Sequence, residues 1–62
     1  MKYNKDQWIS SFEDRLLRLR PHITQRMLDT IALMAWNQAG KKDVDPAKAA
    51  QDWSASMDKP SA

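Results

Sequence analysis

Few side chains in this sequence have the type and spacing that catalysis requires. His22 is the single histidine, and it follows Pro21 in a segment expected to be a turn. Glu13 and Asp14 are adjacent, so on a helix they point about 100° apart and are poorly placed to share a substrate or an ion. The chain has no cysteine and one glycine, which excludes a cysteine metal site and a glycine-rich phosphate loop. We therefore expect a protein without enzymatic activity, metal or cofactor.

Arginines around the end of the first predicted helix are the second chemical feature. The candidate basic patch consists of Arg15, Arg18, Arg20 and Arg26. Because arginine pairs with phosphates through two parallel hydrogen bonds, the patch predicts, as the alternative function, a nucleic-acid-associated accessory protein. The formal net charge is only +2, however, and Asp14 stands four residues before Arg18, the spacing of an ion pair on a helix. A solvated, self-complementary helix face accounts for the same arginines, so we do not expect nucleic acid to be the main partner.

Three stretches have the apolar spacing of helices, and each begins with a residue that can cap one. The candidate caps are Asn4, Thr24 and Asp45. Pro21 favours an end of the first helix just before it, and Pro46 suits the first position of the third. Gly40 follows the last periodic position of the second helix, where a left-handed residue is typical. The predicted helices cover residues 5–19, 25–39 and 46–57.

Short connections between these stretches predict an all-α fold, a small three-helix bundle. Residues 1–57 would form a single domain, and residues 58–62 a flexible tail. A chain of 62 residues without a disulfide buries only about 60% of its unfolded surface, so its stability should be marginal. No apolar run is long enough for a membrane span, and the first residues do not resemble a secretory signal, so we expect a cytoplasmic protein with no membrane partner.

The apolar residues of each stretch predict which face is buried. The first helix gathers Trp8, Ile9, Phe12, Leu16 and Leu19 on one side. The third gathers Ala47, Ala50, Trp53 and Met57, with Trp53 as its main anchor. The second has one broad face of Met27, Leu28, Ile31, Met34 and Ala35. Because residues 31–36 are all apolar, the second helix is predicted to lie at the centre of the bundle.

Three apolar residues do not fit these faces and form the candidate protein interface: Leu17, Leu33 and Trp36. Leu33 and Trp36 are three residues apart and therefore adjacent on one side of the second helix. Two interpretations remain open, since the first or third helix can cover them or they can form an exposed patch that binds a protein. The sequence therefore predicts a small protein–protein interaction module whose partner is either an unknown protein or a second copy, bound through the second helix.

Overall fold

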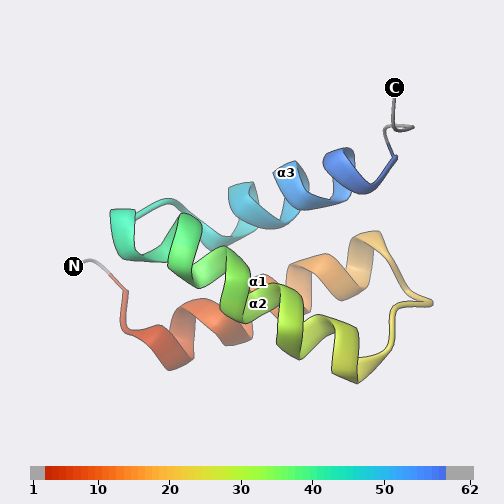
Figure 1. Ribbon diagram of the computed structural model, residues 1–62, viewed down its shortest axis with the longest axis horizontal. Helices are drawn as coiled ribbons and strands as arrows, with labels where there is room; N and C mark the ends of the chain where they lie inside the picture. The colour runs from red at the N-terminus through yellow and green to blue at the C-terminus, as the bar shows by residue number, and fades with distance from the viewer. Residues whose placement is uncertain (1–2, 59–62) are drawn as a thin grey trace.

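The computed structural model describes residues 3–58 and shows three packed α-helices (Figure 1). The helices are α1, Lys5–Leu19; α2, Gln25–Gln38; and α3, Pro46–Asp58, with a short 3-10 helix, η1, Gly40–Lys42, between α2 and α3. Residues 3–58 contain no strand, so the predicted all-α three-helix bundle is confirmed. The side chain of Met57 and the predicted tail beyond Asp58 lie outside the described residues.

Two of the three predicted caps act as expected. The side chain of Asn4 accepts a hydrogen bond from the backbone N–H of Gln7 at 2.8 Å, and that of Thr24 accepts one from Met27 at 3.2 Å. Each bond satisfies a backbone N–H that the first turn of a helix leaves without a partner. The carboxylate of Asp45 accepts a hydrogen bond from the Tyr3 hydroxyl at 3.3 Å. Asp45 therefore connects the segment before α1 to the start of α3.

Gly40 is required for a different reason from the one predicted. The left-handed residue after α2 is Asp43, with φ of 60°, and Gly40 does not have a positive φ. Aspartate is one of the few residue types other than glycine that adopts this conformation readily. At position 40 the constraint is space, since a Cβ atom there would overlap the indole ring of Trp36. The absence of a side chain at Gly40 lets η1 close over that ring.

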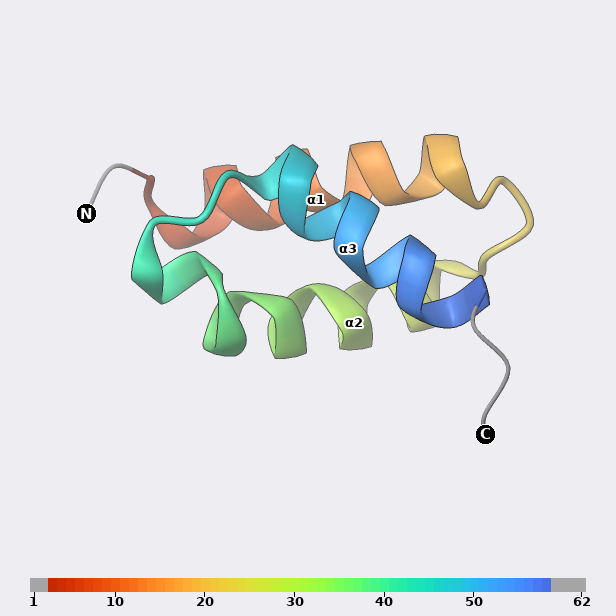
Figure 2. The ribbon, with the colours of Figure 1, turned by 90° about the horizontal axis from the view of Figure 1, so that it is seen from above.

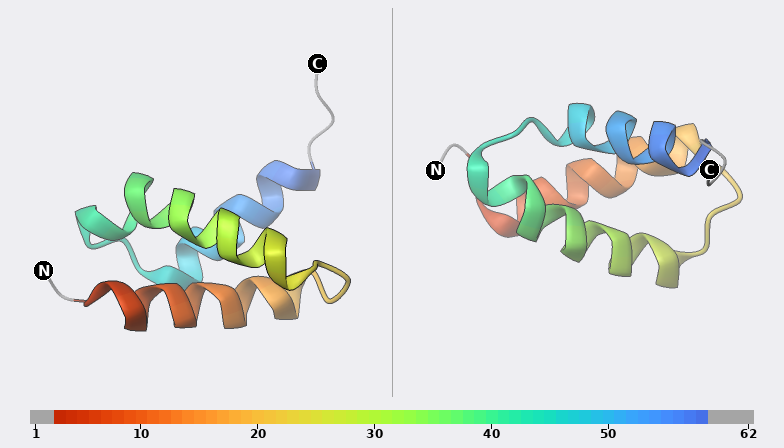
Figure 3. Two further views of the ribbon diagram at one scale, coloured as in Figure 1. Left: turned by 60° about the horizontal axis from the view of Figure 1, so that its bottom comes forward. Right: turned by 45° about the horizontal axis from the view of Figure 1, so that its top comes forward.

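The central helix of the bundle is α1, not α2 as predicted. Both α2 and α3 pack along α1, whereas α2 and α3 have few contacts with each other. Figures 2 and 3 show the two helices lying beside α1 from three further directions. The fully buried large side chains all belong to α1, namely Trp8, Phe12 and Leu16. The core is therefore built on one face of α1. The apolar residues 31–36 of α2 are divided between this core and the exposed surface of the bundle.

Trp8 is the principal anchor of this core. Its indole N–H donates to the carbonyl oxygen of Val44 at 2.7 Å, so the polar atom of a fully buried ring has a partner. The ring stacks on Phe12 at a centroid distance of 5.3 Å and meets the edge of Trp36 at 5.7 Å. One side chain thus joins α1, α2 and the segment that leads into α3. Trp53, the predicted anchor of α3, is only half-buried.

The buried face of α2 is rotated relative to the prediction. Its buried residues are Leu28, Ile31, Ala32, Ala35 and Trp36. Met27 and Met34, which were expected to be buried, are 50% and 44% exposed. The rotation brings the large Trp36 ring against Trp8, which buries more apolar area than a methionine would. It also places Ala32 and Ala35 in the core, where small side chains allow the helices to approach closely.

The second and third helices diverge from the end of the bundle that contains η1. Figure 1 shows α2 and α3 separating toward the turn at residues 20–24, with the second half of α1 visible between them, and the right-hand view of Figure 3 shows the same opening. The backbones of α2 and α3 therefore diverge on one side of α1, and a hollow lined by Gln38, Asp52, Trp53 and Ser56 lies between these helices. The candidate site lies along this side.

Candidate protein interface

The structure separates the three residues of the predicted interface. Leu17 and Leu33 are 43% and 48% exposed, as an interface residue of an isolated chain would be. Trp36 is only 7% exposed, because Trp8 and the backbone at Gly40 cover its ring. The prediction that Trp36 is an exposed interface anchor is therefore wrong, because Trp36 is a core residue. Leu33, three residues before it, faces solvent.

Sequence reasoning missed two exposed residues on the other side of α2. Met27 and Met34 are seven residues apart, so two helical turns place them one above the other. The stripe that contains them continues through Thr30, Ile31 and Gln38 and includes no charged side chain. The sequence analysis places both methionines on the apolar face predicted to be buried, so it does not predict their exposure.

Two hollows lie along the open side of the bundle. The first, about 260 Å³, lies between α2 and α3 and is lined by Gln38, Asp52, Trp53 and Ser56. The second, about 310 Å³, lies beside the turn between α1 and α2 and is lined by Leu19, Arg20, Pro21, His22, Ile23 and Met27. Leu19 was expected to be in the core, but it is 39% exposed at the end of α1. His22 is exposed on the turn.

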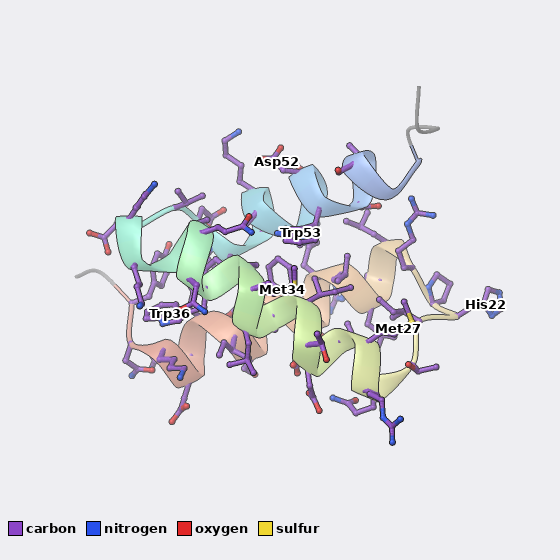
Figure 4. All side chains as sticks on the ribbon, viewed as in Figure 1. His22, Met27, Met34, Trp36, Asp52 and Trp53 are labelled. Carbon is purple, nitrogen blue, oxygen red and sulfur yellow. The ribbon has the colours of Figure 1, made fainter. Side chains whose placement is uncertain are left out.

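The side chains between these hollows form one surface. Figure 4 shows Trp53 and Met34 between α3 and α2, with Met27 farther along α2 toward the turn that carries His22. We call this surface the α2–α3 groove. It is defined by Leu19, Ile23, Met27, Met34, Gln38 and Trp53. Most of its side chains are apolar, and methionine adapts its shape to different contacts, which suits a binding surface.

The four arginines of the predicted basic patch do not act together. Arg18 pairs with Asp14 at 3.4 Å on the exposed side of α1, and it lies with Arg15 beside the start of α3. Arg20 turns toward α3, where its guanidinium donates to the side chain and the backbone carbonyl of Ser54 at 3.1 and 2.8 Å. Arg26 is exposed on α2. Arg15 and Arg18 therefore share one surface, Arg20 and Arg26 lie elsewhere, and Arg20 fastens α1 to α3.

Within residues 3–58 no group of three or more histidine, cysteine, aspartate or glutamate side chains is arranged to hold a metal ion. In the same part of the chain no helix has both the length and the apolar character needed to cross a membrane. The chain matches no protein-family model, no curated protein and no solved structure. The proposal of a function therefore depends on the surfaces of the molecule itself.

Proposed function

We propose that this chain is a non-enzymatic protein-interaction module that binds a helix in the α2–α3 groove, and that a second copy of the chain supplies this helix. The observation that carries the proposal is the exposure of Met27 and Met34 on an uncharged stripe of α2. Single exposed apolar residues are common, but several apolar side chains that gather on one surface are typical of a contact surface. An amphipathic helix laid in such a groove is a frequent mode of recognition.

The uncharged stripe of α2 can pack against the same stripe of a second copy. If two α2 helices pack antiparallel about a two-fold axis near residues 30 and 31, Met27 of each copy meets Met34 of the other. No charge would be buried, since the stripe contains none. The hydroxyl of Thr30 already donates to the carbonyl oxygen of Arg26 at 3.0 Å, so it would keep its hydrogen bond inside the contact. The symmetric contact therefore leaves the hydroxyl of Thr30 at its centre with a partner, and Gln38 lies at its edge.

The expected association is weak. Burying a half-exposed methionine contributes about 1 kcal/mol, so the four methionines of a symmetric pair contribute about 4 kcal/mol. Leu19, Ile23 and Trp53 add apolar area at the edges, but association also loses translational and rotational freedom. A net gain of about 4 kcal/mol corresponds to a dissociation constant of about 1 mM, so we expect association in the range of about 1 mM.

Sedimentation equilibrium of the parent and two variants tests this proposal. Met34→Glu places a charge in both halves of the contact and should weaken association at least about 30-fold, the equivalent of about 2 kcal/mol. Leu33→Glu is the matched control, because Leu33 is next to Met34 on α2 and its side chain is similarly exposed, at 48% against 44%. If Leu33→Glu dissociates the dimer and Met34→Glu does not, the contact uses the leucine side of α2. A parent that remains monomeric at millimolar concentration would exclude the second copy and leave a different protein as the partner.

Nucleic-acid binding is the alternative function. The salt dependence of the affinity separates it from the proposed protein interaction. Association through phosphates weakens steeply as salt rises, whereas an apolar contact changes little. Because the net charge is +2 and Arg20 bonds to Ser54, we expect affinity for duplex DNA to be weaker than about 10 μM at physiological salt. Fluorescence anisotropy with a labelled duplex measures this affinity directly.

A further inference from the structure

The two hollows beside α2 carry side chains of opposite charge. The hollow between α2 and α3 contains one carboxylate, Asp52, beside the half-buried ring of Trp53, and we call it the acidic hollow. The hollow at the turn contains Arg20 and His22 among apolar side chains, and we call it the basic hollow. Figure 4 shows Asp52 on α3 and His22 on the turn, toward opposite ends of α2. The α2–α3 groove therefore has a carboxylate at one end and basic side chains at the other.

The antiparallel arrangement proposed above brings these two ends together. A two-fold axis near residues 30 and 31 pairs residues that are equally far from it along the chain, as Met27 and Met34 are. Ile23 lies four residues before Met27, and Gln38 lies four residues after Met34, so the same axis pairs Ile23 with Gln38 of the second copy. Ile23 lines the basic hollow and Gln38 lines the acidic one. Because a two-fold contact occurs twice, the basic hollow of each copy faces the acidic hollow of the other.

Asp52 is able to accept a hydrogen bond from the second copy. Its Oδ2 atom lies 3.8 Å from the Nζ atom of Lys48, and exposed ion pairs of this kind hold their partners weakly. In the basic hollow, the guanidinium of Arg20 already donates to Ser54 of its own chain. His22 is exposed, and an imidazole N–H donates to a carboxylate. His22 is therefore the basic side chain of the turn that is placed to reach Asp52 of the second copy.

We propose that the turn at residues 20–24 of each copy packs into the acidic hollow of the other, and that His22 pairs there with Asp52. This inference rests on the proposed self-association and adds to it a contact that fixes the direction of packing. The uncharged stripe alone allows two α2 helices to pack either parallel or antiparallel. In a parallel pair like ends meet, so the two Asp52 carboxylates face each other. The pairing of His22 with Asp52 therefore selects the antiparallel arrangement.

Mixing two charge variants tests this proposal. His22→Glu places a second carboxylate opposite Asp52 at both ends of its dimer, and Asp52→Lys places an ammonium opposite His22. Each variant should therefore self-associate at least about 5-fold more weakly than the parent. In the mixed pair, one end keeps His22 with Asp52 and the other end joins the new glutamate to the new lysine. Titration of ¹⁵N-labelled His22→Glu with unlabelled Asp52→Lys, followed by amide chemical shifts, should give an affinity within about 3-fold of the parent.

Asp14→Lys is the matched control, because the side chains of Asp14 and Asp52 are 68% and 69% exposed and each pairs with a cation four residues away. It makes the same change in net charge on a different surface, beside Arg15 and Arg18. Asp14→Lys should self-associate like the parent and should bind His22→Glu at least about 3-fold more weakly than Asp52→Lys does.

The outcomes separate this inference from the proposed function. If the parent self-associates and Met34→Glu prevents it, but His22→Glu binds Asp52→Lys no more tightly than it binds Asp14→Lys, the pairing of the hollows is wrong and the self-association stands. A parent that does not self-associate would overturn both. Stronger binding in the mixture of His22→Glu and Asp52→Lys than in either variant alone, and than in the control mixture, is the result that the proposal requires.

Discussion

Replacing Trp36 with alanine should unfold most of the chain, although sequence analysis alone allowed this residue to be an exposed anchor. The ring is 7% exposed and contacts the edge of Trp8 at a centroid distance of 5.7 Å. Truncation of a buried aromatic side chain costs about 3–5 kcal/mol, and the loss of the aromatic pair is part of that cost. A domain of this length has a total stability of about 3–9 kcal/mol. The variant should therefore retain little or no stability at 37 °C.

Urea and thermal denaturation followed by circular dichroism measure this loss at a concentration far below the expected dissociation constant of the proposed dimer. Leu33→Ala is the control, because Leu33 lies on the same helix and is 48% exposed. It should change stability by less than about 0.5 kcal/mol. The placement of Trp36 in the core would be refuted if Trp36→Ala melted within a few degrees of the parent, or if Leu33→Ala were the more damaging change.

Two further substitutions test contacts that fix the helices in place. Gly40→Ala should destabilise the fold by about 1–3 kcal/mol, because the added Cβ overlaps the indole of Trp36. This loss of stability should be smaller in a Trp36→Leu background, and a double-mutant cycle in urea measures the difference. Arg20→Ala should cost about 1–2 kcal/mol through the lost hydrogen bonds to Ser54, whereas Arg18→Ala, which breaks an exposed ion pair at 3.4 Å, should cost less than about 0.5 kcal/mol. Equal melting temperatures for these two arginine variants would contradict the fastening of α1 to α3 by Arg20.

Helix positions were predictable because the signals that set them are local. Asn4 and Thr24 accept hydrogen bonds from backbone groups three residues away, and the proline at position 46 acts on its own backbone. The role of Asp45 was not local, since its partner Tyr3 is 42 residues distant in the chain. A local pattern does not contain that contact.

The rotation of α2 could not be predicted, because two faces of this helix compete for the core. One face offers Met27 and Met34, and the other offers Trp36. The choice depends on Trp8, whose ring receives the edge of Trp36, and on Gly40, which leaves room for it. Apolar periodicity measures how much each face can bury, but it does not include the shape of the partner helix.

The candidate site was predicted in part. Leu17 and Leu33 are exposed as the interface prediction requires, and their role in binding remains a prediction. The hydrogen bonds of Arg20 to Ser54 depend on how α3 crosses α1, which helical spacing alone does not describe. The same crossing leaves the α2–α3 groove open, so the groove could be recognised only in the structure.

The methyl NMR signals of the methionines test the proposed contact most directly, because the chain has only four methionines. Spectra of the ¹³C-methyl-labelled parent would be compared between about 20 μM and about 1 mM, a range that includes the expected dissociation constant. We predict that the signals of Met27 and Met34 shift with concentration, and that Met34→Glu abolishes the shift of Met27. Signals of both methionines that remain constant over this range would contradict self-association through the α2–α3 groove.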